Sequence, residues 1–281
     1  MQIFSGIAEI RAAVAELRRN GSVGFVPTMG ALHAGHCSLL QAARRRCPGT
    51  VASIFVNPAQ FGPNEDLSQY PCTLEGDVRM LEAEGIDLLF EPTAQEIYPA
   101  GTSTWIEVAG VSERLDGASR PGHFRGVATV VAKLFHIVQP DVAFFGQKDA
   151  AQVAVLRQMV RDLNFPLELA VCPTVREPDG LAMSSRNRYL STAQHQQALS
   201  LFRALQAAEK LASRGERCAQ TLLQAMTATL QRETGVRVEY VAVVDPDTLL
   251  PVEEIQQGAL VAVAAYVGGT RLIDNILLPS A

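Results

Sequence analysis

The chain has 281 residues, of which 48% are hydrophobic and 19% are charged, and this composition excludes a disordered or collagen-like chain. Its 24 basic and 29 acidic residues leave a net charge of −5, which argues against a nucleic acid as the main partner because nucleic-acid binders carry a basic excess. The length exceeds what one hydrophobic core usually supports, so we expect two domains.

No stretch of the sequence predicts a targeting segment or a membrane anchor. The longest apolar run, residues 259–267, is far shorter than the roughly 20 residues that a membrane helix needs, and residues 1–19 lack the apolar core of a signal peptide. The cysteines form no C-x-x-C pair, so neither a disulfide framework nor a zinc site is indicated. We expect a cytoplasmic protein with neither a membrane nor a nucleic acid as its partner.

Short apolar runs alternate with amphipathic stretches through the first part of the chain. Predicted strands cover residues 22–26, 51–56, 87–90, 142–145 and 167–175, and the first of them is expected to end at Pro27. Predicted helices cover residues 36–47, 74–84, 127–138 and 149–163. This alternation is typical of a parallel sheet with helices on both faces, so we predict an α/β, Rossmann-like doubly wound domain.

After about residue 175 the order of the elements changes. Two consecutive helices are predicted at residues 192–213 and 216–233, and strands follow at residues 238–244, 260–267 and 271–278. Two helices packed on a small antiparallel sheet would fit this order. We therefore predict a Rossmann-like ligand-binding domain over residues 1–174 and a smaller α+β lid domain over residues 175–281.

The turn between the first predicted strand and the first predicted helix carries two histidines. Residues 26–36 read VPTMGALHAGH, so His33 and His36 share one face as the helix begins, and Gly35 lets the backbone approach a ligand. A helix N-terminus offers N–H groups and positive potential that suit phosphates. The stretch matches neither a Walker loop nor a G-x-G-x-x-G fingerprint. We favour a nucleotide site over the alternative, a turn with two chance surface histidines.

Two further segments could bind phosphate. Lys148 follows the strand at 142–145 and offers a compact charge, whereas the adjacent Asp149 could simply cap the next helix. Residues 183–186 supply two hydroxyls and a guanidinium after a turn signal at 179–180, and they could equally be a polar helix start.

Neutral amides and a basic stretch complete the candidates. Asn57 and Gln60 follow the strand at 51–56, where they could read hydroxyls or a carboxylate. Residues 114–125 hold three arginines and a histidine among glycines, which is a basic loop at minimum and an anion site as the alternative.

Together these motifs resemble the pantoate–β-alanine ligase family over essentially the whole chain. The residues that carry the resemblance are 26–36, 53–61 (SIFVNPAQF), 96–104 (EIYPAGTST), 115–135, 139–152 (QPDVAFFGQKDAAQ), 179–190 (DGLAMSSRNRYL) and 271–275 (RLIDN). Seven motifs in the right order are specific. The H-x-G-H element alone would indicate only the wider nucleotidyltransferase superfamily.

The resemblance implies a reaction in two steps. ATP and pantoate would form pantoyl adenylate and pyrophosphate, and β-alanine would then displace AMP to give pantothenate, the precursor of coenzyme A. Mg²⁺ would bridge the phosphates, with Asp77 as its protein ligand. The resemblance also implies a homodimer formed through the larger domain.

The resemblance assigns roles to individual residues. The residues along ATP would be Met29, Gly30, Ala31, Leu32, His33, Ala34, Gly35, His36, Gly146, Gln147, Lys148, Asp149, Val175, Met183, Ser184, Ser185 and Arg186. Six of these would act in catalysis, with His36 as the proton donor: His33, His36, Lys148, Ser184, Ser185 and Arg186. Gln60 and Gln152 would bind pantoate with Asn57 beside them, and Gln60 would also lie near β-alanine.

Two positions depart from the family pattern, and two other functions stay open. Cys72 stands where the family often carries arginine, and Ala151 replaces a glutamine that is frequent beside Gln152. An adenylyltransferase of the same superfamily would use the histidines but would not need the amides. A regulatory nucleotide-binding module without catalysis would show erosion of Lys148, His36 or Arg186, and all three are intact.

Overall fold

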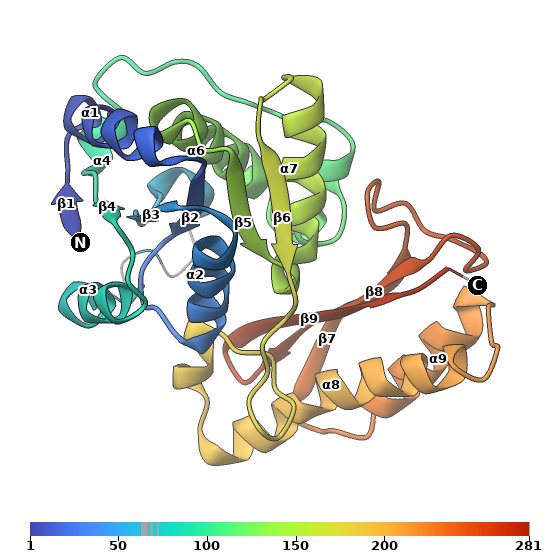
Figure 1. The fold of residues 1–281 in the computed structure, drawn as a ribbon. Coiled ribbons are helices and arrows are strands. Elements are labelled where there is room, and N and C mark those ends of the chain that lie inside the picture. The colour runs from blue at the N-terminus through green and yellow to red at the C-terminus, as the bar shows by residue number, and fades with distance from the viewer. Residues whose placement is uncertain (63–66, 68–69, 72, 281) are drawn as a thin grey trace.

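The computed structural model describes residues 1–62, 67, 70–71 and 73–280, and its larger sheet is parallel throughout (Figure 1). The strand order is β1-β4-β3-β2-β5-β6. The strands are β1 (Gln2–Phe4), β2 (Val23–Thr28), β3 (Gly49–Ile54), β4 (Leu88–Phe90), β5 (Val142–Gly146) and β6 (Glu168–Cys172). From β2 the chain proceeds outward through β3 and β4 on one side and through β5 and β6 on the other. The order therefore reverses between β2 and β5, the point where doubly wound sheets bind ligands.

Helices cover both faces of this sheet. They are α1 (Ile7–Leu17), α2 (Ala34–Arg46), α3 (Leu74–Ala83), α4 (Ala94–Ile97), α5 (Asp116–Ser119), α6 (His123–Val138) and α7 (Ala150–Asp162). Successive strand residues point to opposite faces, so Phe25 and Phe145 join the core under α1, α6 and α7, whereas Val26 and Phe144 join the core under α2 and α3. Burial on both faces explains why these strands read as continuous apolar runs.

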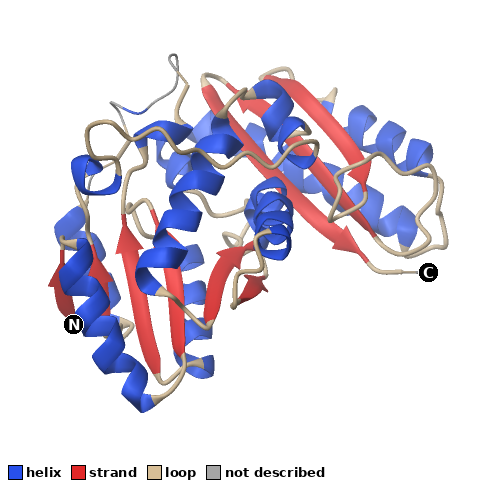
Figure 2. Cartoon of the chain, turned by 90° about the horizontal axis from the view of Figure 1, so that it is seen from above, coloured by secondary structure: helices blue, strands red, loops and turns tan. Residues whose placement is uncertain are grey.

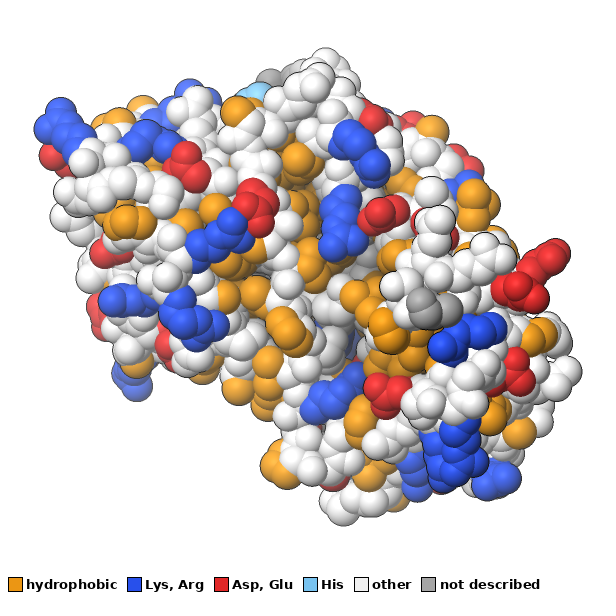
Figure 3. Space-filling model, turned by 45° about the vertical axis from the view of Figure 1, so that its right-hand side comes forward, with side chains coloured by type: hydrophobic (Ala, Val, Ile, Leu, Met, Phe, Trp, Pro, Cys, Tyr) orange, Lys and Arg blue, Asp and Glu red, His pale blue; other side chains and the backbone are white. Residues whose placement is uncertain are grey.

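The C-terminal part is a three-stranded antiparallel sheet with two helices on one face (Figures 1 and 2). Its elements are α8 (Thr192–Ala212), α9 (Ala219–Leu230), β7 (Val236–Val244), β8 (Ala259–Val267) and β9 (Thr270–Leu278). In β8, Val261 and Val263 join the core beneath the helices, whereas Leu260 and Ala262 join the core of the larger sheet. The central strand β8 is thus buried on both faces, and the surface drawn in Figure 3 is hollowed where the two parts meet.

The predicted fold class is confirmed, with local differences. β2 does not end at Pro27 but continues to Thr28 beside β3, where Pro27 pairs with Ser53. β2 pairs with β5 only at Gly24 and Phe25, so Pro27, which has no N–H to donate, lies beyond that ladder. The sequence prediction missed β1, which has only three residues and pairs with β4. Among the described residues, no helix is long and apolar enough to cross a membrane.

Candidate active site

A cleft of about 230 Å³ opens at the carboxyl ends of β2 and β5. The predicted site residues that line it are Met29, His33, Gly35, His36, Asn57, Gln60, Gly146, Lys148, Asp149, Gln152, Val175, Met183, Ser184, Ser185 and Arg186. The structure thus brings the segment after β2, the segment after β5 and the segment at 183–186 to one cavity. The predicted residues outside this lining are Gly30, Ala31, Leu32, Ala34, Asp77 and Gln147.

The two histidines form a reciprocal cap at the start of α2. The His33 Nδ1 atom accepts a hydrogen bond from the Gly35 backbone N–H (3.1 Å), and the His36 Nδ1 atom accepts one from the His33 backbone N–H (3.3 Å). Burial and, less strongly, the charge of Lys148 lower the pKa of His33 to about 4. Burial and the neighbouring His33 lower the pKa of His36 to about 3. Both rings are therefore neutral at pH 7, with the proton on Nε2, so each has one N–H to donate.

Asp77 holds the loop between β2 and α2 from beneath. Its carboxylate is buried (3% exposed) and accepts hydrogen bonds from the backbone N–H groups of Ala31 (2.9 Å) and Leu32 (2.8 Å). The hydroxyl of Thr73 lies 3.2 Å from both carboxylate oxygens. These contacts give the Asp77 carboxylate a structural role outside the lining of the cleft, and its expected role as a metal ligand stays a prediction. Ala31 and Leu32 are themselves buried and lie outside the lining of the cleft, so their expected contacts with ATP stay a prediction.

Lys148 and Asp149 lie in a 3₁₀ turn, Gln147–Asp149, between β5 and α7. The Lys148 Nζ atom is 3.5 Å from the Asp149 Oδ1 atom, and the lysine side chain is 20% exposed. Asn275 of β9 holds this turn, since its Nδ2 atom donates to the carbonyls of Gln147 (3.0 Å) and Lys148 (2.8 Å). Gln147 also donates from its side chain to Asn275 (3.0 Å), so it joins the turn to the smaller sheet and does not face the cleft. Sequence reasoning assigned no role to Asn275, although it lies in the RLIDN motif.

Asn57, in the loop after β3, forms hydrogen bonds with the residues around it. It is 1% exposed, its Nδ2 atom donates to the Gln60 side-chain oxygen (3.0 Å) and to the Gly126 carbonyl (3.2 Å), and its Oδ1 atom accepts from Tyr98 (2.8 Å). Burial raises the pKa of Tyr98 to about 12, so the phenol keeps its donor proton. Gln60 also donates to the Met29 sulfur (3.0 Å). The amide that faces the cavity is therefore set in place by a buried network.

The segment at 183–186 is anchored through the residues before it. The Arg176 guanidinium binds the buried Asp274 carboxylate of β9 with two contacts, 2.6 and 3.0 Å, and lies over the Phe202 ring. The Ser184 hydroxyl accepts a hydrogen bond from the Arg186 N–H (3.2 Å) and so caps the following 3₁₀ turn, Ser185–Tyr189. Of the two departures, Ala151 is buried in the core, and Cys72 lies outside the described residues.

Comparisons with known proteins agree along the whole chain. The family model for pantoate-beta-alanine ligases matches residues 2–277. A pantothenate synthetase of Acidobacterium capsulatum is 62% identical over 97% of this chain and 95% of its own length.

Solved structures are similar as well. A pantothenate synthetase of Thermus thermophilus superposes with a TM-score of 0.94 at 49% identity, covering 98% of this chain and 99% of that one. A pantoate-beta-alanine ligase of Francisella tularensis, complexed with beta-gamma ATP and beta-alanine, superposes with a TM-score of 0.80 at 35% identity, covering 99% of this chain and 97% of that one. The matches therefore extend over both sheets and every segment of the cleft, and the chain belongs to the pantoate–β-alanine ligase family.

Proposed function

We propose that this protein condenses pantoate with β-alanine to give pantothenate, with ATP cleaved to AMP and pyrophosphate through a pantoyl adenylate. The observation that carries the proposal is the single cleft at which three segments meet, each with groups suited to phosphate. Neutral amides, Gln60 and Gln152, line the same cleft. An adenylate-forming enzyme needs both kinds of group, because it must hold a triphosphate and orient a carboxylate beside it.

In the first step the pantoate carboxylate attacks the α-phosphate, and negative charge accumulates on the phosphoryl oxygens. Lys148 and Arg186 supply fixed positive charge there, and the neutral rings of His33 and His36 supply Nε2–H donors. The negative charge of a bound triphosphate raises the pKa of both rings, which would let His36 act as a proton donor in the complex. Loss of one such group typically costs about 10²–10³ in rate.

The residues of the cleft also fit the Mg²⁺ ion that the family implies. Asp149 is the cleft carboxylate nearest to the cations, and its side chain is 49% exposed, so it can offer a hard oxygen to the ion. We propose that Asp149 takes the role first expected of Asp77, together with phosphate oxygens. Mg²⁺ would neutralise charge on the phosphates, while Lys148 and Arg186 orient them.

We propose the division into residues 1–174 and 175–281 as two domains, since the last strand of the larger sheet ends at Cys172 and the smaller sheet has its own core. In this arrangement the C-terminal part would act as a lid that excludes water from the hydrolysis-prone adenylate. A homodimer and a cytoplasmic location stay predictions.

The proposed function is tested by incubating the protein with ATP, pantoate and β-alanine and then omitting each in turn. We expect pantothenate and AMP in equal amounts only with all three substrates, and pantoate-dependent exchange of pyrophosphate into ATP without β-alanine. ATP binding with no turnover would instead indicate a regulatory module. Turnover without any requirement for β-alanine or pantoate would indicate an adenylyltransferase with another substrate.

A further inference from the structure

The segment at residues 96–104 carries part of the family resemblance, yet none of its residues lines the main cleft. Within it, Tyr98 follows α4 and packs against the core of the larger domain. The centroid of its ring lies 6.4 Å from that of Phe55 and 6.3 Å from that of Trp105, and the Lys133 Nζ atom lies 5.5 Å from it. Contacts with three separate segments therefore fix the direction in which the Tyr98 hydroxyl points.

The Tyr98 hydroxyl lies against the Asn57 amide, 2.8 Å from the Oδ1 atom. Two backbone groups determine which way round this amide lies. The Ala59 N–H, which can only donate, is 3.3 Å from Oδ1, and the Gly126 carbonyl, which can only accept, is 3.2 Å from Nδ2. Tyr98 must therefore donate to Asn57. The phenol keeps the proton for this bond, because burial raises its pKa to about 12.

The orientation of Asn57 in turn sets the orientation of the Gln60 side chain. The Asn57 Nδ2 atom donates to the Gln60 Oε1 atom (3.0 Å), so the oxygen of Gln60 is directed toward Asn57. The Gln60 Nε2 atom then faces the other way and donates to the Met29 sulfur (3.0 Å). Met29 and Gln60 both line the main cleft. Gln60 consequently offers N–H donors, and not its oxygen, to a ligand in the cleft.

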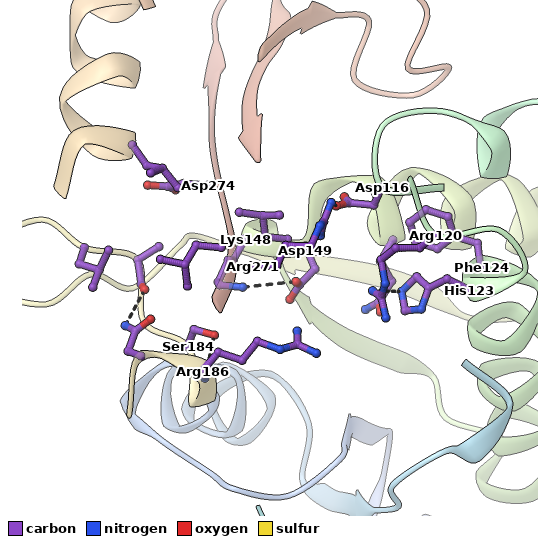
Figure 4. Close-up of a pocket in the computed structure, with 17 residues that line it drawn as sticks. Asp116, Arg120, His123, Phe124, Lys148, Asp149, Ser184, Arg186, Arg271 and Asp274 are labelled. Carbon is purple, nitrogen blue, oxygen red and sulfur yellow. Dashed lines mark hydrogen bonds and ion pairs between the residues drawn. The ribbon is translucent and has the colours of Figure 1, made fainter. Parts of the chain in front are cut away.

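The backbone of Gln60 is held separately, by the first turn of α6. A Cβ atom at Gly126 would lie 2.2 Å from the Ala59 carbonyl oxygen and 2.7 Å from the Gln60 Cα atom, so only glycine permits this approach. His123, labelled in Figure 4, has its Nδ1 atom 2.8 Å from the Gln60 carbonyl oxygen. Because these contacts fix the backbone, the hydrogen bonds from Tyr98 through Asn57 control which end of the Gln60 amide faces the cleft.

We propose that Tyr98 is a positioning residue for the proposed reaction, and that its hydroxyl, acting through Asn57, keeps the N–H groups of Gln60 directed into the cleft. Without this hydroxyl, only the two longer contacts with the backbone orient Asn57, and both amides are less restrained. A Gln60 oxygen turned into the cleft would repel a carboxylate, because neither group has a proton to donate. The inference rests on the proposed function and gives the segment at 96–104 a role from outside the cleft.

The test measures pantoate-dependent ATP–pyrophosphate exchange for Tyr98→Phe, which removes the hydroxyl and keeps the ring with its contacts. We expect kcat/KM for pantoate to fall about threefold to tenfold, the usual cost of a lost hydrogen bond between neutral groups, and the KM for ATP to stay within about twofold. A purely structural effect would change the values for both substrates. A fall of less than about twofold for pantoate, or an equal change for ATP, would overturn the proposal.

A double-mutant cycle tests whether Tyr98 acts through Gln60. In Gln60→Ala no amide is left to orient, so adding Tyr98→Phe should change kcat/KM for pantoate by less than about twofold. An equal fall with and without Gln60 would show that the hydroxyl acts elsewhere and would refute the positioning role.

Gln60→Glu tests the direction of the amide, because it replaces the N–H groups by an oxygen of similar position. We expect it to raise the KM for pantoate at least as much as Gln60→Ala does. A KM equal to that of the unmodified protein would contradict the conclusion that N–H donors face the cleft.

Tyr240→Phe is the matched control. The Tyr240 hydroxyl donates to the Asp116 Oδ2 atom (3.3 Å), and Asp116 lies among the side chains of Figure 4 and not in the Gln60 loop. This variant removes the same group elsewhere, so we expect both kinetic values to stay within about twofold. Thermal unfolding checks that each variant is folded. Should the unmodified protein show no pantoate-dependent exchange, the proposed function itself would fail, which is a separate result.

Discussion

Replacing Asp77 tests whether its carboxylate stabilises the loop between β2 and α2 or binds a metal ion. In Asp77→Ala, the N–H groups of Ala31 and Leu32 lose their acceptor inside a buried region. Each hydrogen bond to a charged group contributes about 1.5–3 kcal/mol, so we expect the free energy of unfolding to fall by about 3–6 kcal/mol. Asp77→Asn keeps one acceptor oxygen and should lose about half of that. Ala31 has a φ of 51°, a left-handed conformation that costs energy and that this hydrogen bond helps to hold.

The assay is urea unfolding, followed by the Mg²⁺ dependence of the exchange reaction. Glu75→Gln is the control, because it removes a carboxylate that is 91% exposed from the first turn of the same helix, and it should change stability by less than about 0.5 kcal/mol. One result would refute the structural reasoning. In it, the free energy of unfolding of Asp77→Ala would lie within about 0.5 kcal/mol of that of the unmodified protein, and the variant would need far more Mg²⁺ for half-maximal exchange.

Three further predictions follow from the site. Lys148→Ala should lower the rate of pantoate-dependent ATP–pyrophosphate exchange by about 10²–10³ with unchanged thermal unfolding, and near-normal exchange would remove the phosphate role. Gln152→Ala should raise the KM for pantoate by the equivalent of about 1–3 kcal/mol while calorimetric ATP binding stays nearly unchanged; a comparable loss of ATP binding would contradict the division of the cleft. Because the pKa of His36 is lowered to about 3 in the folded state, the unfolded state binds more protons between pH 6.5 and 3, and stability falls as the pH falls through that window. The lowered pKa of His36 should reduce the free energy of unfolding by about 2 kcal/mol at pH 5. Urea unfolding at pH values from 7 to 5 should therefore show a shallower decline in stability for His36→Asn than for the unmodified protein.

Local sequence patterns determined the elements and the class of the fold. The apolar run at 142–145 forms all of β5 but its last residue, and the helical spacing at 192–213 corresponds to α8, because burial of a strand or of one helix face requires hydrophobic residues at set intervals. Motif order likewise identified His33, Lys148 and Arg186, which the structure brings to one cleft. The elements are local in the sequence, so periodicity was sufficient to predict them, whereas the roles expected of the site residues came from the family resemblance.

Only the tertiary structure decided which polar groups line the cleft and which hold those groups in place. No sequence near Asp77 or Asn57 shows that their side-chain oxygens accept hydrogen bonds from Leu32 and Tyr98, respectively, which are 45 and 41 residues away. Asn275 reaches the turn at Lys148 across 127 residues. Whether a polar side chain is already satisfied depends on neighbours that are distant in the chain, and no local pattern records those contacts. The same reason applies to His123, whose ring lies 2.8 Å from the Gln60 carbonyl oxygen, 63 residues away in the sequence.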